Sequence, residues 1–226
     1  MKFYEHDSFN QVIQEYSELN DLIEIIKNSE SQNKSSWNKI NELASSYKKS
    51  HYQLLFYSLV KHLRLKKCTE IGVLNGFSLF SMGLGIKDSK SNGVVQGFDL
   101  FEDYKYNKQK FEIVESDLKR IELEKYVKLK KMDAFQVQNA VKTTDLLHVD
   151  ISNDGSTYEK ILNNWDKKVR KIILFEGGSI ERDSIDWMKD YEKEKISDKL
   201  KVLRDLFPHW KIFVLKPFPS ITLFFR

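Results

Sequence analysis

The chain has 226 residues, of which 41% are hydrophobic and 31% charged, with a formal net charge of +4. This composition is ordinary for a folded protein and allows one α/β domain with a sizeable core. No apolar run approaches the length of a membrane span, and residues 1–7 lack the apolar core of a signal peptide. The single cysteine, Cys68, excludes an internal disulfide framework and a cysteine-based zinc site. We therefore expect a cytoplasmic protein without a membrane partner.

The first part of the chain, residues 1–64, is predicted to be helical. Apolar residues recur at three- and four-residue spacing over 8–28, which is typical of an amphipathic helix. Two more helices are predicted over 37–48 and 50–63, and the second is apolar nearly all round. We expect this extension to form a lid or a subunit contact, so a homodimer is possible. The alternative is that the helix over 8–28 packs on the core of its own domain.

From residue 65 the pattern alternates between strands and helices. Strands are predicted over 67–72, 93–99, 126–132, 145–151 and 170–176, with helices over about 76–86, 107–122, 134–141 and 156–167 between them. This alternation predicts a parallel sheet with crossover helices.

The end of the chain departs from that alternation. A long helical stretch over 180–206 precedes two strands, 210–215 and 220–225, and so short a loop between strands makes them antiparallel neighbours. The sequence thus predicts an α/β fold with a doubly wound, mostly parallel seven-stranded sheet that ends in an antiparallel hairpin, in a domain over 65–226.

A glycine turn follows the first predicted strand. Gly72 lets the backbone turn sharply and approach a ligand, and the helix that opens near Gly76 presents free amide groups. The turn differs from the dinucleotide fingerprint G-x-G-x-x-G, because Leu74 occupies the place of the second glycine. It indicates a nucleotide-binding loop of another kind.

Acidic residues fall at the carboxyl ends of five successive predicted strands, where open α/β sheets bind ligands. They are Glu70, Asp99, Asp133, Asp150 and Glu176. Asp99 is placed to accept two hydrogen bonds from a ribose diol, and NAD would be held in the same way. Asp133 is placed to accept from an adenine amino group, with Phe135 over the ring; the alternative for Asp133 is a helix N-cap.

The motif Glu-x-Gly-x-x-x-Gly, the Asp after the second strand and the terminal hairpin together resemble the class I S-adenosylmethionine-dependent methyltransferases, over Leu65 to Arg226. The resemblance implies a cofactor site for S-adenosylmethionine. Its residues would be Glu70, Gly72, Asn75 and Gly76 at the methionine end, Asp99 at the ribose, and Asp133, Ala134 and Phe135 at the adenine. It further implies O-methylation of a small-molecule or sugar hydroxyl. An NAD-dependent oxidoreductase and a non-catalytic binding or assembly protein are the alternatives.

The same resemblance places Asp150 beside the transferable methyl group. His148 lies two residues earlier and faces the same side of the strand, so it is a candidate base, or else a satisfied core histidine. Glu176 completes the catalytic set. Some members bind a divalent metal here through an acid after the fourth strand and two consecutive ligands after the fifth.

In this chain glycines follow Glu176, so one metal ligand is missing. Asp154 or Asp183 could replace it, and magnesium is possible but not favoured. In the loop after Glu176, Arg182 is predicted either to bind an anionic or polyhydroxyl substrate or to form a surface pair with an Asp. A Ser-x-x-Glu capping box is predicted over 156–159.

Basic clusters at 64–67, 128–131 and 167–171 lie at or before predicted strand starts. In a parallel sheet this is the rim opposite the ligand-binding edge. We interpret the clusters as a solvated rim and expect no nucleic-acid partner.

Overall fold

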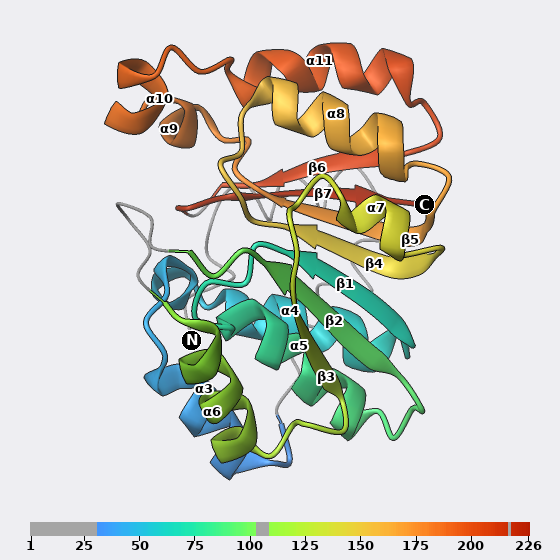
Figure 1. The fold of residues 1–226 in the computed structure, drawn as a ribbon. Helices are drawn as coiled ribbons and strands as arrows, with labels where there is room; N and C mark the ends of the chain where they lie inside the picture. The colour runs from blue at the N-terminus through green and yellow to red at the C-terminus, as the bar shows by residue number, and fades with distance from the viewer. Residues whose placement is uncertain (1–30, 103–108, 217) are drawn as a thin grey trace.

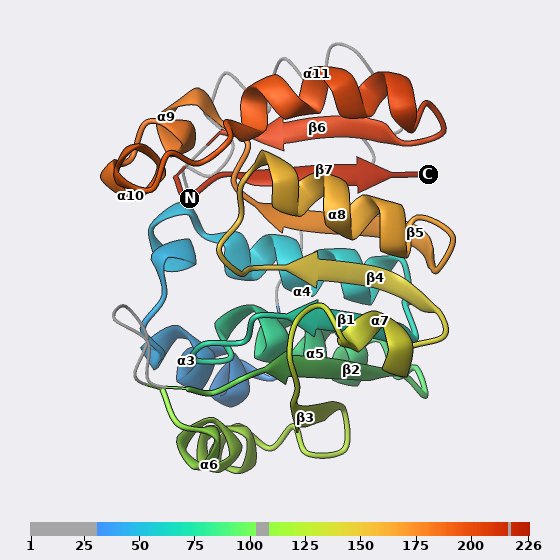
Figure 2. The same cartoon turned by 45° about the horizontal axis from the view of Figure 1, so that its top comes forward.

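The computed structural model describes residues 31–102, 109–216 and 218–226, so the helix predicted over 8–28 lies outside the described residues. Its centre is a seven-stranded sheet in the order β3-β2-β1-β4-β5-β7-β6 (Figure 2). The strands are β1 (Lys67–Ile71), β2 (Val94–Asp99), β3 (Val127–Lys131), β4 (Thr144–Val149), β5 (Val169–Glu176), β6 (Lys211–Leu215) and β7 (Ile221–Phe225). β1 to β5 pair in parallel, and β7 runs antiparallel to both β5 and β6. The predicted topology and hairpin are confirmed.

Helices cover both faces of the sheet (Figure 1). One apolar core lies between the sheet and the helices α3 (Lys34–Glu42), α4 (Tyr52–His62), α5 (Phe77–Asp88) and α6 (Phe111–Ile121). A second core lies between the other face and α7 (Val137–Ala140), α8 (Gly155–Trp165) and α11 (Ile196–Leu206). The central strands read as continuous apolar runs because both faces are buried.

Two predicted helices are broken into shorter pieces. The stretch predicted as one helix over 180–206 forms α9 (Ile180–Asp183), α10 (Asp186–Asp190) and α11. The chain folds back between them, because the Asp183 carboxylate accepts the first amides of α11, from Ile196 at 3.0 Å and Ser197 at 2.9 Å. The helix predicted over 37–48 ends at Glu42, and a short 3-10 helix, η2 (Ser46–Ser50), follows. Its start is set by the Ser45 side chain, which accepts from the Tyr47 amide at 3.2 Å.

The 44–52 segment, which contains η2, contacts both sides of the carboxyl edge of the sheet. On one side, the side-chain amide of Asn75 donates to the Ala44 carbonyl at 2.8 Å. On the other, the Ser50 hydroxyl donates to the Phe218 carbonyl at 2.6 Å, and the Tyr52 hydroxyl donates to the Leu215 carbonyl at 3.2 Å. α4, which follows, is buried over most of its length and belongs to the same core as α5. The role of residues 1–64 as a lid or subunit contact stays a prediction.

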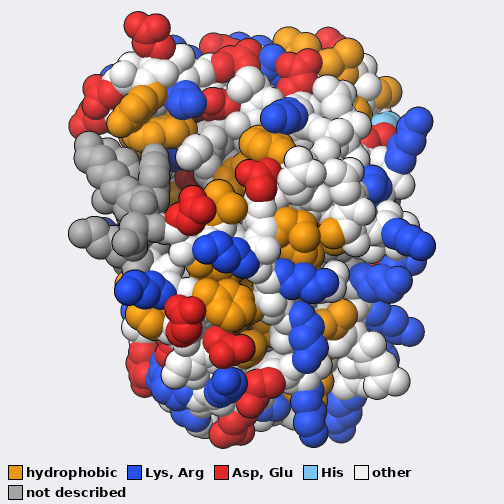
Figure 3. Space-filling model, viewed as in Figure 1, with side chains coloured by type: hydrophobic (Ala, Val, Ile, Leu, Met, Phe, Trp, Pro, Cys, Tyr) orange, Lys and Arg blue, Asp and Glu red, His pale blue; other side chains and the backbone are white. Residues whose placement is uncertain are grey.

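Two of the three basic clusters lie where the sequence predicts them, because they precede or enter β1 and β5. The third, 128–131, runs through β3 at the sheet edge to the carboxyl end of that strand, so its assignment to the opposite rim is wrong. Lys and Arg side chains gather along the margin of the molecule where the parallel strands begin (Figure 3). Within the described residues, no helix combines the length and the apolar composition needed to cross a membrane.

Candidate functional site

A cavity of about 940 Å³ opens at the carboxyl ends of β1, β2 and β4. Six residues predicted from the sequence line it: Gly72, Asp99, Asp133, Ala134, Phe135 and Asp150. The other five predicted residues, Glu70, Asn75, Gly76, His148 and Glu176, are not among the lining residues. The structure therefore brings together all four ribose and adenine candidates, one of the four methionine-end candidates and one of the three catalytic candidates.

The glycine turn is shaped by close contact between β1 and β4. Gly72 has a φ of 87°, and its amide donates to the Phe98 carbonyl at 2.9 Å. A Cβ atom at this position would lie 1.8 Å from the Asp150 carbonyl oxygen. Only glycine permits both the dihedral angle and the approach, so Gly72 sets how near the turn lies to Asp150. Gly76 also has a positive φ, of 79°, and is the N-cap of α5.

Asp99 holds the glycine turn as well as lining the cavity. Its Oδ2 atom accepts from the amides of Val73 at 2.7 Å and Leu74 at 3.1 Å, and its Oδ1 atom accepts from the Phe101 amide at 2.8 Å. A carboxylate offers about four acceptor positions, so roughly one is left for a ligand. The assignment of Asp99 to a ribose diol stays a prediction, with about one acceptor position free for a hydroxyl.

The adenine candidates lie on the loop after β3. The Asp133 Oδ1 atom accepts from the Phe135 amide at 2.9 Å, which closes a local turn. α7 begins only at Val137, with Gln136 as its N-cap, so the alternative of an N-cap at Asp133 is wrong. The Lys160 ammonium lies 3.5 Å from the centroid of the Phe135 ring and covers one of its faces.

Glu70 and His148 are fully buried beside the cavity rather than in its wall. The Ser78 hydroxyl donates to Glu70 Oε1 at 2.6 Å, and Glu70 Oε2 lies 3.6 Å from His148 Nδ1. Burial raises the pKa of Glu70, while the neighbouring His148 and the hydrogen bond from Ser78 oppose this shift. The His148 Nε2 atom lies 3.4 Å from the Tyr47 hydroxyl, and its ring packs 4.7 Å from that of Phe56.

Asp150 is the acid of the catalytic set that reaches the cavity. Burial raises its pKa, and the neighbouring His148, Tyr47 and Arg182 side chains oppose that shift. A raised pKa brings a carboxylate closer to the range in which it accepts protons at neutral pH. The position and chemistry of Asp150 fit a general base.

Glu176 is engaged by Arg182. The two side chains form a bidentate ion pair, with Nε to Oε1 at 2.5 Å and Nη2 to Oε2 at 3.0 Å, and each residue is at most 7% exposed. Burial raises the pKa of Glu176 to about 7, with Arg182 opposing the shift. The predicted surface pair between Arg182 and an Asp is wrong, because the guanidinium is buried on Glu176.

The two residues suggested as replacement metal ligands have other partners. Asp154 caps α8, accepting from the Thr157 amide and the Ser156 hydroxyl, each at 2.8 Å, and pairs with Lys193 at 3.4 Å. The N-cap is therefore Asp154, and the capping box predicted over 156–159 is wrong. Asp183 caps α11. In the part of the chain that the structure describes, no group of three His, Cys, Asp or Glu side chains is arranged to hold a metal.

Several residues of the site were not singled out from the sequence. Trp187 lines the cavity, with the Arg182 guanidinium 5.6 Å and the Lys193 ammonium 5.4 Å from its ring centroid. An isolated tryptophan in the charged stretch after Glu176 was the available signal. Tyr47 contacts His148, but no sequence pattern marks it, because the residues around it predict the end of a helix.

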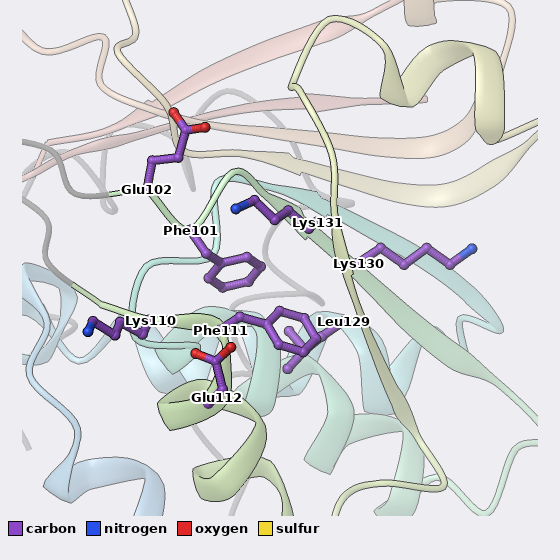
Figure 4. Close-up of a pocket in the computed structure, with 8 residues that line it drawn as sticks. All are labelled: Phe101, Glu102, Lys110, Phe111, Glu112, Leu129, Lys130 and Lys131. Atoms are coloured by element: carbon purple, nitrogen blue, oxygen red, sulfur yellow. The ribbon is translucent and has the colours of Figure 1, made fainter.

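A smaller cavity of about 470 Å³ lies between β3 and α6 (Figure 4). The rings of Phe101 and Phe111 meet edge to face there, 5.1 Å apart, and Leu129 lies beside them. Its charged residues stand around this apolar centre, and none of the predicted site residues lines it. We therefore assign the functional site to the larger cavity.

Residues 69–175 match the family model described as a methyltransferase domain. No curated protein sequence matches the chain.

Similar solved structures extend the comparison over most of the chain. An SAH-bound methyltransferase of Podospora anserina is 15% identical, with 94% of this chain and 96% of that chain covered and a TM-score of 0.62. The O-methyltransferase of Bacillus cereus, solved with SAH, is 16% identical, with 88% and 92% covered and a TM-score of 0.59. The O-methyltransferase TomG of Streptomyces achromogenes, solved with SAM, is 14% identical, with 87% and 90% covered and a TM-score of 0.58.

At these identities the structural likeness establishes the fold, and the family model covers the segment that forms β1 to β5. Residues 69–175 thus match a methyltransferase domain, and the chain has the methyltransferase fold that the sequence predicts.

Proposed function

We propose that this protein transfers a methyl group from S-adenosylmethionine to a hydroxyl oxygen of a small molecule or sugar. The observation that carries the proposal is the single cavity wall shared by Gly72, Asp99, Asp133 and Asp150. The cavity of about 940 Å³ lies within the range of about 300–1,000 Å³ found for cofactor and ligand pockets. The O-methyltransferases among the structural relatives support the choice of oxygen as the methylated atom.

Different residues of the cavity would hold different parts of the cofactor. Asp99 has one acceptor position left for a ribose hydroxyl, and the loop at Asp133 to Phe135 would hold the adenine. The glycine turn provides a close backbone approach that a side chain at Gly72 would abolish. S-adenosylmethionine, when bound, supplies a methyl group on a cationic sulfur. The carboxylates in the wall suit a ligand that carries this positive charge.

Asp150 is assigned to the acceptor. The new bond forms between the acceptor oxygen and the methyl carbon, the carbon–sulfur bond breaks, and the hydroxyl proton passes to the Asp150 carboxylate. Methyl transfer depends on alignment more than on covalent catalysis, and the described residues around the cavity include neither a Ser nor a Cys arranged as an activated nucleophile. Trp187 and Arg182 also line the cavity, with the guanidinium 5.6 Å from the Trp187 ring centroid, and are candidates for contact with the acceptor.

Calorimetry with S-adenosylhomocysteine and, separately, NAD tests the cofactor assignment. We expect binding of the first and none of the second; the reverse would turn the proposal toward an oxidoreductase. Methyl transfer is then measured with radiolabelled S-adenosylmethionine and a panel of phenols, sugars and hydroxy acids. Cofactor binding without transfer to any member of a broad panel would favour the non-catalytic binding protein.

Two further expectations accompany the proposal. We expect the enzyme to act in the cytosol, because its one cysteine, Cys68, is buried and unpaired. A homodimer through residues 1–64 remains a prediction, and light scattering of the full chain would measure it.

A further inference from the structure

Three buried side chains contact one another beside the cavity, and each comes from a different element. Tyr47 comes from η2, Glu70 from β1 and His148 from β4. Tyr47 is 3% exposed and the other two are fully buried. None of the three lines the cavity, so none is placed to touch a cofactor or a substrate directly.

The hydrogen-bond partners of Glu70 and His148 show which of their atoms face each other. Glu70 Oε1 accepts the Ser78 hydroxyl. Glu70 Oε2 and His148 Nδ1 are buried and have no hydrogen-bond partner within the described residues, and they face each other at 3.6 Å. Buried polar atoms are almost always paired, so a small closure of this gap satisfies both. An ionised Glu70 can only accept hydrogen bonds, so in that state the shared proton lies on Nδ1.

That arrangement fixes the other side of the imidazole. With its proton on Nδ1, the neutral ring has an acceptor at Nε2, which is the atom 3.4 Å from the Tyr47 hydroxyl. Burial, together with the charges of Asp150, Glu176 and Glu70, holds the pKa of Tyr47 far above its usual range, so the hydroxyl keeps its proton. The Asp150 carboxylate lies near enough for its charge to help raise that pKa. The Tyr47 hydroxyl proton therefore has two acceptors in its surroundings, His148 Nε2 and the Asp150 carboxylate.

We propose that Glu70, His148 and Tyr47 are positioning residues for Asp150. Glu70 fixes the tautomer of His148, His148 Nε2 shares the Tyr47 hydroxyl with Asp150, and the Asp150 carboxylate is thereby held with an oxygen toward the acceptor. This inference rests on the proposed function. It moves Glu70 from the cofactor to the interior, and it gives Tyr47, which lies outside the matched segment 69–175, a part in the site.

The tautomer of His148 is the first test. The full chain is labelled with ¹⁵N-histidine, and long-range ¹H–¹⁵N spectra are recorded; the His148 signals are those lost in His148→Gln. We expect a protonated Nδ1 and an unprotonated Nε2 that is shifted upfield from a free imidazole nitrogen. A proton on Nε2 would overturn the proposal, since Tyr47 could not donate to that atom.

Two substitutions then test the shared proton. Tyr47→Phe should move the Nε2 signal downfield, toward a free nitrogen. Asp150→Ala removes the competing acceptor and should move it further upfield. Tyr52→Phe is the control, because this neighbouring ring lies 5.7 Å from the Tyr47 ring and its hydroxyl donates to the Leu215 carbonyl; it should leave Nε2 unmoved. Opposite shifts would not arise from a purely structural role.

The outcomes separate this inference from the proposed function. Calorimetry with S-adenosylhomocysteine is run on the same samples. Absence of binding by the unsubstituted chain counts against the proposed function. An Nε2 signal that Asp150→Ala leaves unmoved, in a protein that binds S-adenosylhomocysteine, overturns the positioning role alone. That variant alters a residue at the cavity wall, so the test stands even where Tyr47→Phe fails to fold.

Discussion

Replacing Asp99 with alanine should damage both the glycine turn and cofactor binding. The carboxylate accepts three backbone amides, those of Val73, Leu74 and Phe101. It also has one acceptor position left for a ribose hydroxyl. The two roles predict two separate losses, one in the free energy of unfolding and one in affinity.

The size of each loss follows from the surroundings of the three amides. Hydrogen bonds to a charged group contribute about 1.5–3 kcal/mol each when buried. The Val73 and Phe101 amides make part-buried bonds, whereas water can replace the carboxylate at the exposed Leu74 amide. We therefore expect Asp99→Ala to lower the free energy of unfolding by about 2–4 kcal/mol. Loss of the single ribose bond, again about 1.5–3 kcal/mol, should weaken S-adenosylhomocysteine binding roughly ten- to a hundredfold.

Urea unfolding and calorimetry measure the two quantities on the same protein. Asp133→Ala is the matched control, because Asp133 is exposed and holds a single amide, that of Phe135. This substitution should change the free energy of unfolding by no more than about 0.5 kcal/mol, while still weakening the binding of S-adenosylhomocysteine. Unchanged affinity in folded Asp99→Ala would remove the ribose assignment, and unchanged stability would refute the anchoring of the turn.

Three further predictions concern the remaining parts of the site. Gly72→Ala should destabilise the protein by about 3 kcal/mol or more, since the added methyl would strain a left-handed residue and overlap the Asp150 carbonyl; thermal unfolding that shows less than half of this would argue against the close approach. Asp150→Asn should lower turnover by about 10²–10⁴-fold with little change in S-adenosylhomocysteine affinity, and a fully active variant would place the chemistry elsewhere. Burial raises the pKa of Glu176 from 4.5 to about 7. The contribution of Glu176 to stability is therefore present below pH 4.5 and is lost as the pH rises through 7. Urea unfolding should show the free energy of unfolding falling as the pH rises across this range, with a smaller fall in Glu176→Gln.

The fold was predictable because its signals are local and repeated. Continuous apolar runs such as those of β4 and β5 indicate buried parallel strands, and the short connection between β6 and β7 permits only an antiparallel pair. What could not be predicted were breaks that depend on distant partners. The division of 180–206 needs the Asp183 carboxylate to reach amides 13 and 14 residues away, and residue spacing does not reveal such a contact.

The site was predictable to the extent that it lies at strand ends. Asp99, Asp133 and Asp150 line the cavity because the carboxyl ends of parallel strands share one edge. Burial could not be foreseen residue by residue. Glu70 pairs with Gly97, two residues before Asp99, so it lies deeper in the sheet and is sealed against Ser78 and His148. Tyr47 could not be found at all, since it comes from a segment whose link to the site is purely tertiary.

The 44–52 segment ties the two halves of the crevice to each other. Ala44 is held by Asn75 from the glycine turn, and Ser50 holds Phe218 in the connection between β6 and β7. A ligand that orders the glycine turn should therefore also reduce the motion of the connection between β6 and β7. In deuterium exchange, amides near residue 218 should slow on addition of S-adenosylhomocysteine although that loop does not line the cavity. The segment would then couple the two ends of the crevice, so that a ligand bound at one end restricts backbone motion at the other.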